Sequence, residues 1–173
     1  MQKVSFAEID LRIFHLINGY AKKSSTLDFF GIFCAKYLGY VMIFVLAFFS
    51  YNTQNASIFF LPMATGLVSL ALNEIVYLFY KKNRPAEVIF ENILISKVIS
   101  PSFPSSHASF FFALSFTLFL FFFPLAIIFL IISFLISLAR IFCGAHWPMD
   151  IVGGIGSAFA SFLVIWTVLV AVG

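Results

Sequence analysis

The sequence predicts an all-α integral membrane protein: a bundle of about five transmembrane helices, with an amphipathic interfacial helix at the N-terminus. Of its 173 residues 62% are hydrophobic, 10% are charged and 26 are phenylalanine, more than a water-soluble core of this size could bury. The apolar runs approach the roughly 20 residues that a membrane-spanning helix needs. The chain is predicted to be one domain, residues 1–173, with 1–26 as interfacial helix and linker and 27–173 as the helical bundle.

Residues 5–21 have the period of an amphipathic helix. The apolar residues Phe6, Ile9, Ile13, Leu16, Ile17 and Tyr20 fall on one stripe, and Glu8, Arg12 and His15 fall opposite. Ser5, followed three residues later by Glu8, predicts a capping box. A helix of this composition lies in the membrane interface, although an ordinary extension of the first span is the alternative.

Five apolar segments follow, separated by polar connections. They cover about residues 27–50, 57–80, 105–123, 124–140 and 148–173. A polar turn occupies 51–55, Pro124 marks a tight turn, and 81–104 form the one long polar connection. On the fifth segment Gly154 and Ala158 are four residues apart, which favours close helix packing. If each segment crosses the membrane once, the end of the second, the start of the third, the end of the fourth and the start of the fifth all lie on the same side. These are the segment ends that carry ionisable residues.

Ionisable residues gather at three points between these segments. They are Arg84, then His107, and then Arg140 with His146 and Asp150. Such residues are costly in a bilayer and are usually functional. Ser105 and Ser106 begin a helix, whose free amides and dipole favour an anion, although alone they indicate only a helix cap. Two arginines on the same side favour a phosphate, because guanidinium groups match its oxygens.

His146 and Asp150 share a helix face if Pro148 lies in the first helical turn. A carboxylate on one imidazole nitrogen leaves the other nitrogen free, as a nucleophilic histidine requires. A helix-capping pair is the alternative interpretation. His107 would then act as a general acid for the leaving oxygen.

Cofactors and soluble partners are not indicated. The sequence has neither a His-x-x-x-His pair nor a carboxylate cluster, so no metal or other cofactor is predicted. Cys34 and Cys143 form no metal motif, and a disulfide between them is not predicted. The net charge of +3 is too small for a nucleic-acid partner. Membrane lipids are the expected partners, and the sequence indicates no oligomeric state.

These residues resemble the three motifs of the type 2 phosphatidic acid phosphatase superfamily, in outline Lys-x6-Arg-Pro, Pro-Ser-Gly-His and Ser-Arg-x5-His-x3-Asp. The matching segments are residues 77–85, 104–107 and 139–150, and their order and spacing fit across 57–173. Three positions depart from the pattern: Tyr77 replaces the lysine, Ser106 the glycine and Ala139 the serine. Lys81 or Lys82 is the candidate substitute for the missing cation.

The resemblance implies a metal-independent membrane phosphatase that acts on lipid phosphates or diphosphates. His146 would attack phosphorus and form a phosphohistidine, Asp150 would orient it, and His107 would protonate the leaving group. The phosphoryl oxygens would be held by Arg84, Arg140, Ser105 and Ser106, with Lys81 or Lys82 in addition. The pattern is most similar to bacterial undecaprenyl-diphosphate phosphatases, with lipid A 1-phosphatases and phosphatidylglycerophosphate phosphatases as alternatives. Head-group specificity is expected in residues 86–103.

A membrane scaffold or lipid-binding protein without activity is the rival hypothesis. The absent lysine and serine favour it, whereas the intact histidines, Arg140 and Asp150 favour an enzyme. With the spans given above, all ten Lys and Arg residues lie on or near the side of the membrane that carries the site. The positive-inside rule predicts that this side faces the cytoplasm. The resemblance places the site outside the bacterial cytoplasmic membrane. Because several charges are explained as phosphate ligands, we expect the outward orientation.

Overall fold

The computed structural model describes residues 5–89, 92–95 and 100–172, and within these ranges its regular structure is helical throughout. The helices are α1 (Phe6–Asn18), α2 (Ser25–Lys36), α3 (Leu38–Asn52), α4 (Ser57–Phe79), α5 (Pro85–Val88), α6 (Ser106–Leu118), α7 (Phe123–Phe142) and α8 (Pro148–Val172). The predicted all-α class is confirmed. Parts of the 86–103 stretch, where head-group specificity is expected, lie outside the described residues.

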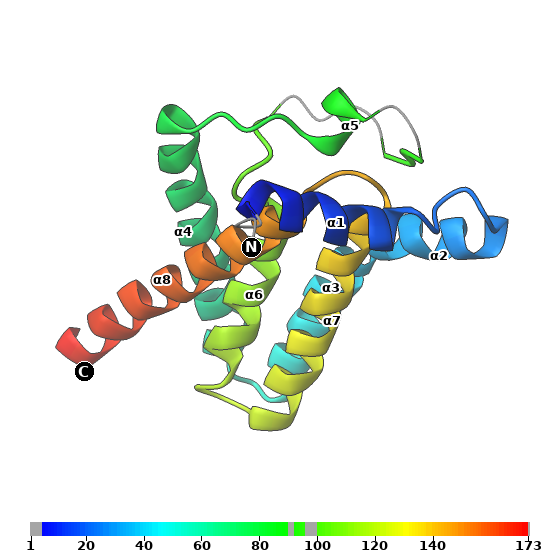
Figure 1. Ribbon diagram of the computed structural model, residues 1–173. Helices are drawn as coiled ribbons and strands as arrows, with labels where there is room; N and C mark the ends of the chain where they lie inside the picture. Colours follow the sequence, from blue (N-terminus) through cyan, green and yellow to red (C-terminus); the bar gives the residue numbers. More distant parts are fainter. Residues whose placement is uncertain (1–4, 90–91, 96–99, 173) are drawn as a thin grey trace.

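Helix α1 lies across one end of the bundle and contacts α7 and α8 (Figure 1). Its N-terminus has the predicted capping box, in which Ser5 and Glu8 bind each other's backbone. Most of the predicted apolar stripe is exposed, as suits a face that meets lipid. A different set of residues, Asp10, Phe14 and Asn18, is buried against the bundle. These three recur every four residues, so they form a seam along one side of the helix.

The first apolar segment is not the single straight helix that the sequence predicts. It consists of α2 and α3, which are bent by 49° where they join. A Cβ on Gly31 would lie 2.5 Å from the Phe142 ring, and one on Gly39 would lie 2.2 Å from the Phe111 ring. The two glycines therefore bring the two halves against rings on different helices, α7 and α6, and the bend accommodates both contacts.

Within the described residues, α4, α7 and α8 are long and apolar enough to cross a membrane, and the bent pair α2–α3 makes a fourth candidate. Helix α6 is apolar but only 13 residues long, and it lies at the centre of the bundle against α4, α7 and α8. Pro148 begins α8, as predicted. Pro124, predicted to mark a turn, instead lies in the first turn of α7, where proline costs no helical hydrogen bond.

The connections that carry the motif residues gather at one end of the molecule. Figure 1 shows α1, α5 and the α7–α8 loop at the same end as the C-terminus of α4 and the N-terminus of α6. The turns after α3 and α6 lie at the opposite end. This arrangement confirms that the three motif-bearing segments converge, although they are distant in sequence.

Candidate active site

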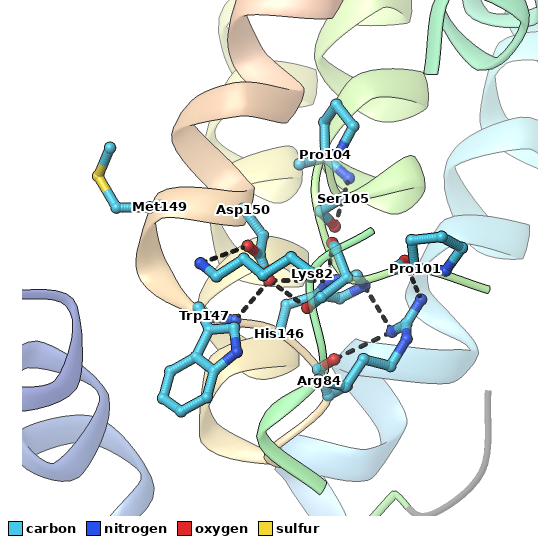
Figure 2. Close-up of polar contacts among 12 residues, drawn as sticks. Lys82, Arg84, Pro101, Pro104, Ser105, His146, Trp147, Met149 and Asp150 are labelled. Carbon is cyan, nitrogen blue, oxygen red and sulfur yellow. Dashed lines mark hydrogen bonds and ion pairs between the residues drawn. The ribbon is translucent and has the colours of Figure 1, made fainter. Parts of the chain in front are cut away.

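His146 lies in the loop between α7 and α8, and hydrogen bonds hold its ring on both sides (Figure 2). Its Nδ1 lies 2.9 Å from the carbonyl oxygen of Ser102 and 3.5 Å from Oδ2 of Asp150. Both neighbours are acceptors, so Nδ1 carries the proton and Nε2 keeps its lone pair. Nε2 accepts a hydrogen bond from Nη1 of Arg84 at 3.0 Å. His146 and Asp150 approach each other, but His146 lies in the loop before α8 and not on a shared helix face, and the closer partner of Nδ1 is a backbone carbonyl.

The protonation state of His146 follows from its surroundings. Burial lowers the pKa of His146 to about 4; the charges of Arg140 and Arg84 add to this effect, and the Asp150 carboxylate opposes it. The imidazole is therefore neutral at neutral pH. A neutral imidazole close to two positive charges can attack an electrophile that carries negative charge.

Asp150 is fully buried in the first turn of α8 and connects three other residues of the site. Its Oδ2 accepts hydrogen bonds from the Ser102 hydroxyl and, at 2.8 Å, from the Trp147 amide. Its Oδ1 pairs with Nζ of Lys82 at 3.0 Å. The position of Asp150 is thus fixed by donors from three segments, and this in turn restrains His146. The sequence holds no signal for Ser102, which is a loop serine outside the motifs.

Lys82 is held between two carboxylates. Its Nζ lies 3.0 Å from Oδ1 of Asp150 and 3.0 Å from Oδ2 of Asp10, whose other oxygen accepts the Met149 amide at 2.8 Å. Burial alone would lower the pKa of Lys82, but the two carboxylates outweigh it and raise the pKa. Lys82 is therefore paired with two carboxylates, and its contact with a phosphate stays a prediction. Lys81 is exposed and forms no hydrogen bond or ion pair within the described part of the chain.

Arg84 uses all five of its N–H donors inside the protein, and Figure 2 shows it beside Pro101 and His146. Its Nε donates to the Ser100 carbonyl at 3.0 Å, and Nη2 donates to the Ser100 hydroxyl at 3.0 Å and to the Pro101 carbonyl at 3.2 Å. Its Nη1 donates to the Ala145 carbonyl at 3.0 Å and to Nε2 of His146. The buried guanidinium group therefore holds two loops together and covers the imidazole nitrogen that has the free lone pair.

Arg140, at the end of α7, is equally buried but scarcely bonded. It is 5% exposed, and within the described residues its Nε has no hydrogen-bond partner. Its hydrogen bond there is a long one, 3.5 Å from Nη1 to the carbonyl oxygen of Ala35. A buried cation with unused donors is costly unless an anion completes its bonding. Arg140 is therefore the stronger candidate anion ligand of the two arginines.

The N-terminus of α6 offers two further donors. Ser105 caps the helix: its hydroxyl accepts the Ala108 amide at 3.5 Å, and its own amide donates to the Asp150 carbonyl at 2.9 Å. Ser105 is thus engaged within the protein. The amides of Ser106 and His107 have no acceptor among the described residues. They are the donors through which a helix N-terminus binds an anion.

Tyr77 occupies the position of the lysine in the first motif, and its hydroxyl contacts the second motif. It donates to the Pro104 carbonyl at 2.7 Å and lies 3.0 Å from Oγ of Ser106. Tyr77 therefore fixes the start of α6 by hydrogen bonds, where the motif lysine would supply a charge.

His107 lies in the first turn of α6, within electrostatic reach of Arg140, His146 and Arg84. It lines a cavity of about 130 Å³ beside the α2–α3 junction. The two predicted histidines and both arginines therefore belong to one site. Among the described residues no three His, Cys, Asp or Glu side chains are arranged to hold a metal ion.

The sequence is similar to a known family and to known bacterial proteins. The sequence model of the PAP2 superfamily matches residues 58–172. The chain is 29% identical over 168 residues to the bacitracin transport permease protein BcrC of Bacillus licheniformis, covering 95% of this chain and 83% of that protein. It is 27% identical over 149 residues to undecaprenyl-diphosphatase BcrC of Bacillus subtilis (strain 168), covering 85% of this chain and 77% of that protein.

Two crystal structures have the same fold. Aquifex aeolicus LpxE aligns with a TM-score of 0.71 and 21% identity, over 92% of this chain and 95% of that chain. A PAP2-type phosphatidylglycerolphosphate phosphatase from Bacillus subtilis aligns with a TM-score of 0.68 and 16% identity, over 99% and 90% of the two chains. At these identities the structural matches support the fold.

Proposed function

The chain belongs to the PAP2 superfamily, and from this premise we propose that it removes the terminal phosphoryl group of a lipid diphosphate such as undecaprenyl diphosphate. The observation that carries the proposal is the neutral His146 imidazole close to Arg140, a buried arginine with unused donors. The choice of a diphosphate lipid is supported by the similarity to the Bacillus subtilis relative named undecaprenyl-diphosphatase.

In the first step, Nε2 of His146 attacks the terminal phosphorus. The N–P bond forms as the bond from phosphorus to the bridging oxygen breaks. His107, which takes up a proton once the diphosphate offsets the positive charges of Arg140 and Arg84, gives that proton to the departing oxygen. Arg140 and the free amides at the start of α6 hold the phosphoryl oxygens, where charge stabilisation lowers the barrier. The Ser102 carbonyl and Asp150 keep the proton on Nδ1.

In the second step, water attacks the phosphohistidine. The water gives a proton to His107, the N–P bond breaks, and inorganic phosphate and neutral His146 are restored. Every proton and bond in this sequence is handled by side chains, water and substrate. We therefore expect hydrolysis to persist in excess chelator, and a loss of activity that a divalent cation specifically restores would contradict the histidine mechanism.

Arg84 has to move before the first step. Its Nη1 lies 3.0 Å from Nε2 of His146, where the phosphorus must arrive. The terminal phosphoryl group offers charged acceptors in place of the imidazole nitrogen, and hydrogen bonds between ionised groups are stronger than neutral ones. The contact to His146 is thus exchanged for one to the substrate, which gives Arg84 the phosphate contact expected from the sequence.

The surroundings of the site suit a lipid. An almost wholly apolar groove of about 350 Å³ lies between α1, α2 and α7, with Leu16, Phe30 and Leu138 in its wall. Ala139, beside Arg140 in the chain, also lines this groove. Burying an acyl or prenyl chain contributes roughly 0.8 kcal/mol per CH₂ group. Water-soluble phosphate esters lack this contribution and should be poor substrates.

The lipid substrate also fits a location in the bacterial cytoplasmic membrane, with the site facing outward. The exposed apolar faces of α1, α4 and α8 would meet lipid. The positive charges at the site's end, which otherwise favour the cytoplasm, include Arg84 and Arg140, whose place is explained by phosphate. Labelling of a cysteine introduced at Asn83, in intact cells with a membrane-impermeant reagent, tests the orientation.

Purified protein in detergent micelles provides the test of function. We expect phosphate release from undecaprenyl diphosphate at the highest kcat/KM, weaker release from undecaprenyl phosphate, lipid A 1-phosphate or phosphatidylglycerophosphate, and little from a water-soluble ester. His146→Ala serves as the inactive control. Release from none of these lipids would overturn the proposal and favour a lipid-binding scaffold. Strict activity on one lipid would overturn the broad range and point to a selective element in residues 86–103.

A further inference from the structure

A small cavity lies against His107 on the side of the α2–α3 junction. It has a volume of about 130 Å³, and its wall includes His107 from α6, Lys36 from the end of α2, and Tyr40 from α3. The rest of the wall is mainly apolar, with Phe111 and Ile136 among its residues. The cavity therefore brings together a lysine that belongs to none of the three motifs and the histidine proposed as the general acid.

Lys36 is free to bind an anion there. It is exposed, and within the described residues it forms no ion pair. Lys82, by contrast, is already held by Asp10 and Asp150. A lysine in the last turn of a helix also interacts favourably with the helix dipole, which accounts for the residue type but not for its place in a cavity with His107.

The cavity adjoins the candidate anion site at Arg140. Ala35, next to Lys36, lines the cavity, and its carbonyl oxygen is the acceptor for Nη1 of Arg140. The Nε of Arg140 is buried without a partner in the described part of the chain. Two cationic side chains thus border one region: Arg140, with unused buried donors, and Lys36, which lines the same cavity as His107.

We propose that Lys36 binds the inner phosphoryl group of a diphosphate lipid, the group that stays on the lipid when the terminal phosphate is removed. This inference rests on the function proposed above. When the bond between phosphorus and the bridging oxygen breaks, negative charge develops on the departing lipid phosphate, and a cation that lines the same cavity as the general acid stabilises it. A monophosphate lipid has no inner phosphate, so Lys36 selects diphosphate over monophosphate head groups.

Two non-hydrolysable inhibitors test this assignment: methylenediphosphonate, with two phosphoryl groups, and methylphosphonate, with one. Inhibition constants would be measured on whichever lipid the wild type hydrolyses. In the wild type methylenediphosphonate should bind at least about tenfold more tightly, since one charge-assisted hydrogen bond is worth about that factor. Lys36→Met should remove about tenfold of its affinity and change that of methylphosphonate less than about twofold.

Controls separate a local contact from general electrostatics and from misfolding. Lys23→Met removes a charge from an exposed lysine outside this cavity and should leave both inhibition constants unchanged. Lys36→Arg keeps the charge and should keep the preference, which shows that the position tolerates substitution. Equal effects of Lys36→Met on both inhibitors, no effect, or a wild type without preference would overturn the inference. A wild type that hydrolyses no lipid phosphate would instead overturn the proposed function.

Discussion

Arg84 and Arg140 come from the same set of motifs, are buried to the same degree and lie in the same site, yet their bonding is opposite. Every N–H of Arg84 has an acceptor in the protein. Four of the five hydrogen bonds go to Ser100, Pro101 and Ala145. Arg140 has one long hydrogen bond, and its Nε is unpaired within the described residues. Arg84 mainly holds the site together, although one of its donors is expected to pass to the substrate, whereas Arg140 has unused donors for an anion.

The largest expected effect follows directly from this difference. Arg140→Met should reduce kcat/KM at least about a hundredfold, the typical cost of removing one electrostatic donor, and should leave thermal stability unchanged or raised. Arg84→Met should also impair turnover, but it removes the donor from three carbonyls that are buried or part-buried, those of Ser100, Pro101 and Ala145, at roughly 1–3 kcal/mol each. The free energy of unfolding should therefore fall by more than about 3 kcal/mol.

Turnover and the melting temperature in detergent, measured with and without vanadate, distinguish the two arginines. Vanadate should stabilise the wild type and the Arg84 variant relative to their own baselines, but not the Arg140 variant. If Arg84→Met melts like the wild type, or if Arg140→Met melts far lower, the assigned division of labour is wrong.

The pH dependence of turnover sharpens the comparison, because both arginines act on His146. A depressed pKa keeps most of the imidazole neutral down to about pH 4, where half of the activity is lost. At pH 5 about 10% of the activity should then be lost. A histidine of ordinary pKa would be almost fully protonated at this pH, and only roughly one thirtieth of the activity would remain. Arg140→Met should move the acid limb to higher pH, since it removes one of the charges that lower the pKa.

The measurement is kcat/KM from pH 3.5 to 8, corrected for the substrate's own ionisation by a titration of the lipid. Lys23→Met, which changes a charge outside the site, is the matched control and should leave the limb in place. An acid limb near pH 6.5 in the wild type would show that His146 is not held neutral by its surroundings.

A smaller effect is expected at Asp10, which is linked to Asp150 through Lys82. Asp10→Asn weakens the ion pair with Lys82, so it should lower kcat about five- to tenfold while KM changes little. Glu74→Gln, which neutralises an exposed carboxylate on α4, is the control and should be silent. If Asp10→Asn and Glu74→Gln behave alike in steady-state assays, α1 has no part in positioning Asp150.

The smallest effect is expected at Tyr77. Tyr77→Phe removes the hydrogen bonds to Pro104 and Ser106 but keeps the ring, so stability should fall by about 1 kcal/mol and kcat/KM two- to fivefold. Thermal unfolding and steady-state assays measure both. A loss as large as that of Arg140→Met would mean that the Tyr77 hydroxyl contacts the substrate itself.

Much of the fold was accessible from sequence, because membrane helices are defined by local composition. Helix class, the capping box at Ser5 and the place of Pro148 are confirmed. The bend between α2 and α3 was not accessible. It depends on Gly31 and Gly39 approaching rings that lie about seventy or more residues away, and nothing in the local hydropathy marks that contact.

The candidate site was accessible as a list of residue types, but not as a bonding pattern. The motif spacing identified His146 and both arginines, whereas the partners that separate Arg84 from Arg140 are mostly backbone carbonyls, which every residue has. Asp10 was missed for a different reason. It lies on the buried side of α1 with Phe14 and Asn18. The sequence interpretation divided α1 into an apolar stripe and a charged face, and it did not consider a separate side that packs against the bundle.

The central claim is that the terminal phosphoryl group is transferred to Nε2 of His146. The most direct measurement is a rapid alkaline quench of the protein during turnover of undecaprenyl diphosphate labelled with ³²P in its terminal phosphate, followed by peptide mapping. We predict acid-labile, alkali-stable label on the peptide that contains His146, and none in His146→Ala, which should also be inactive. Continued turnover in His146→Ala, or label on another residue, would contradict the account.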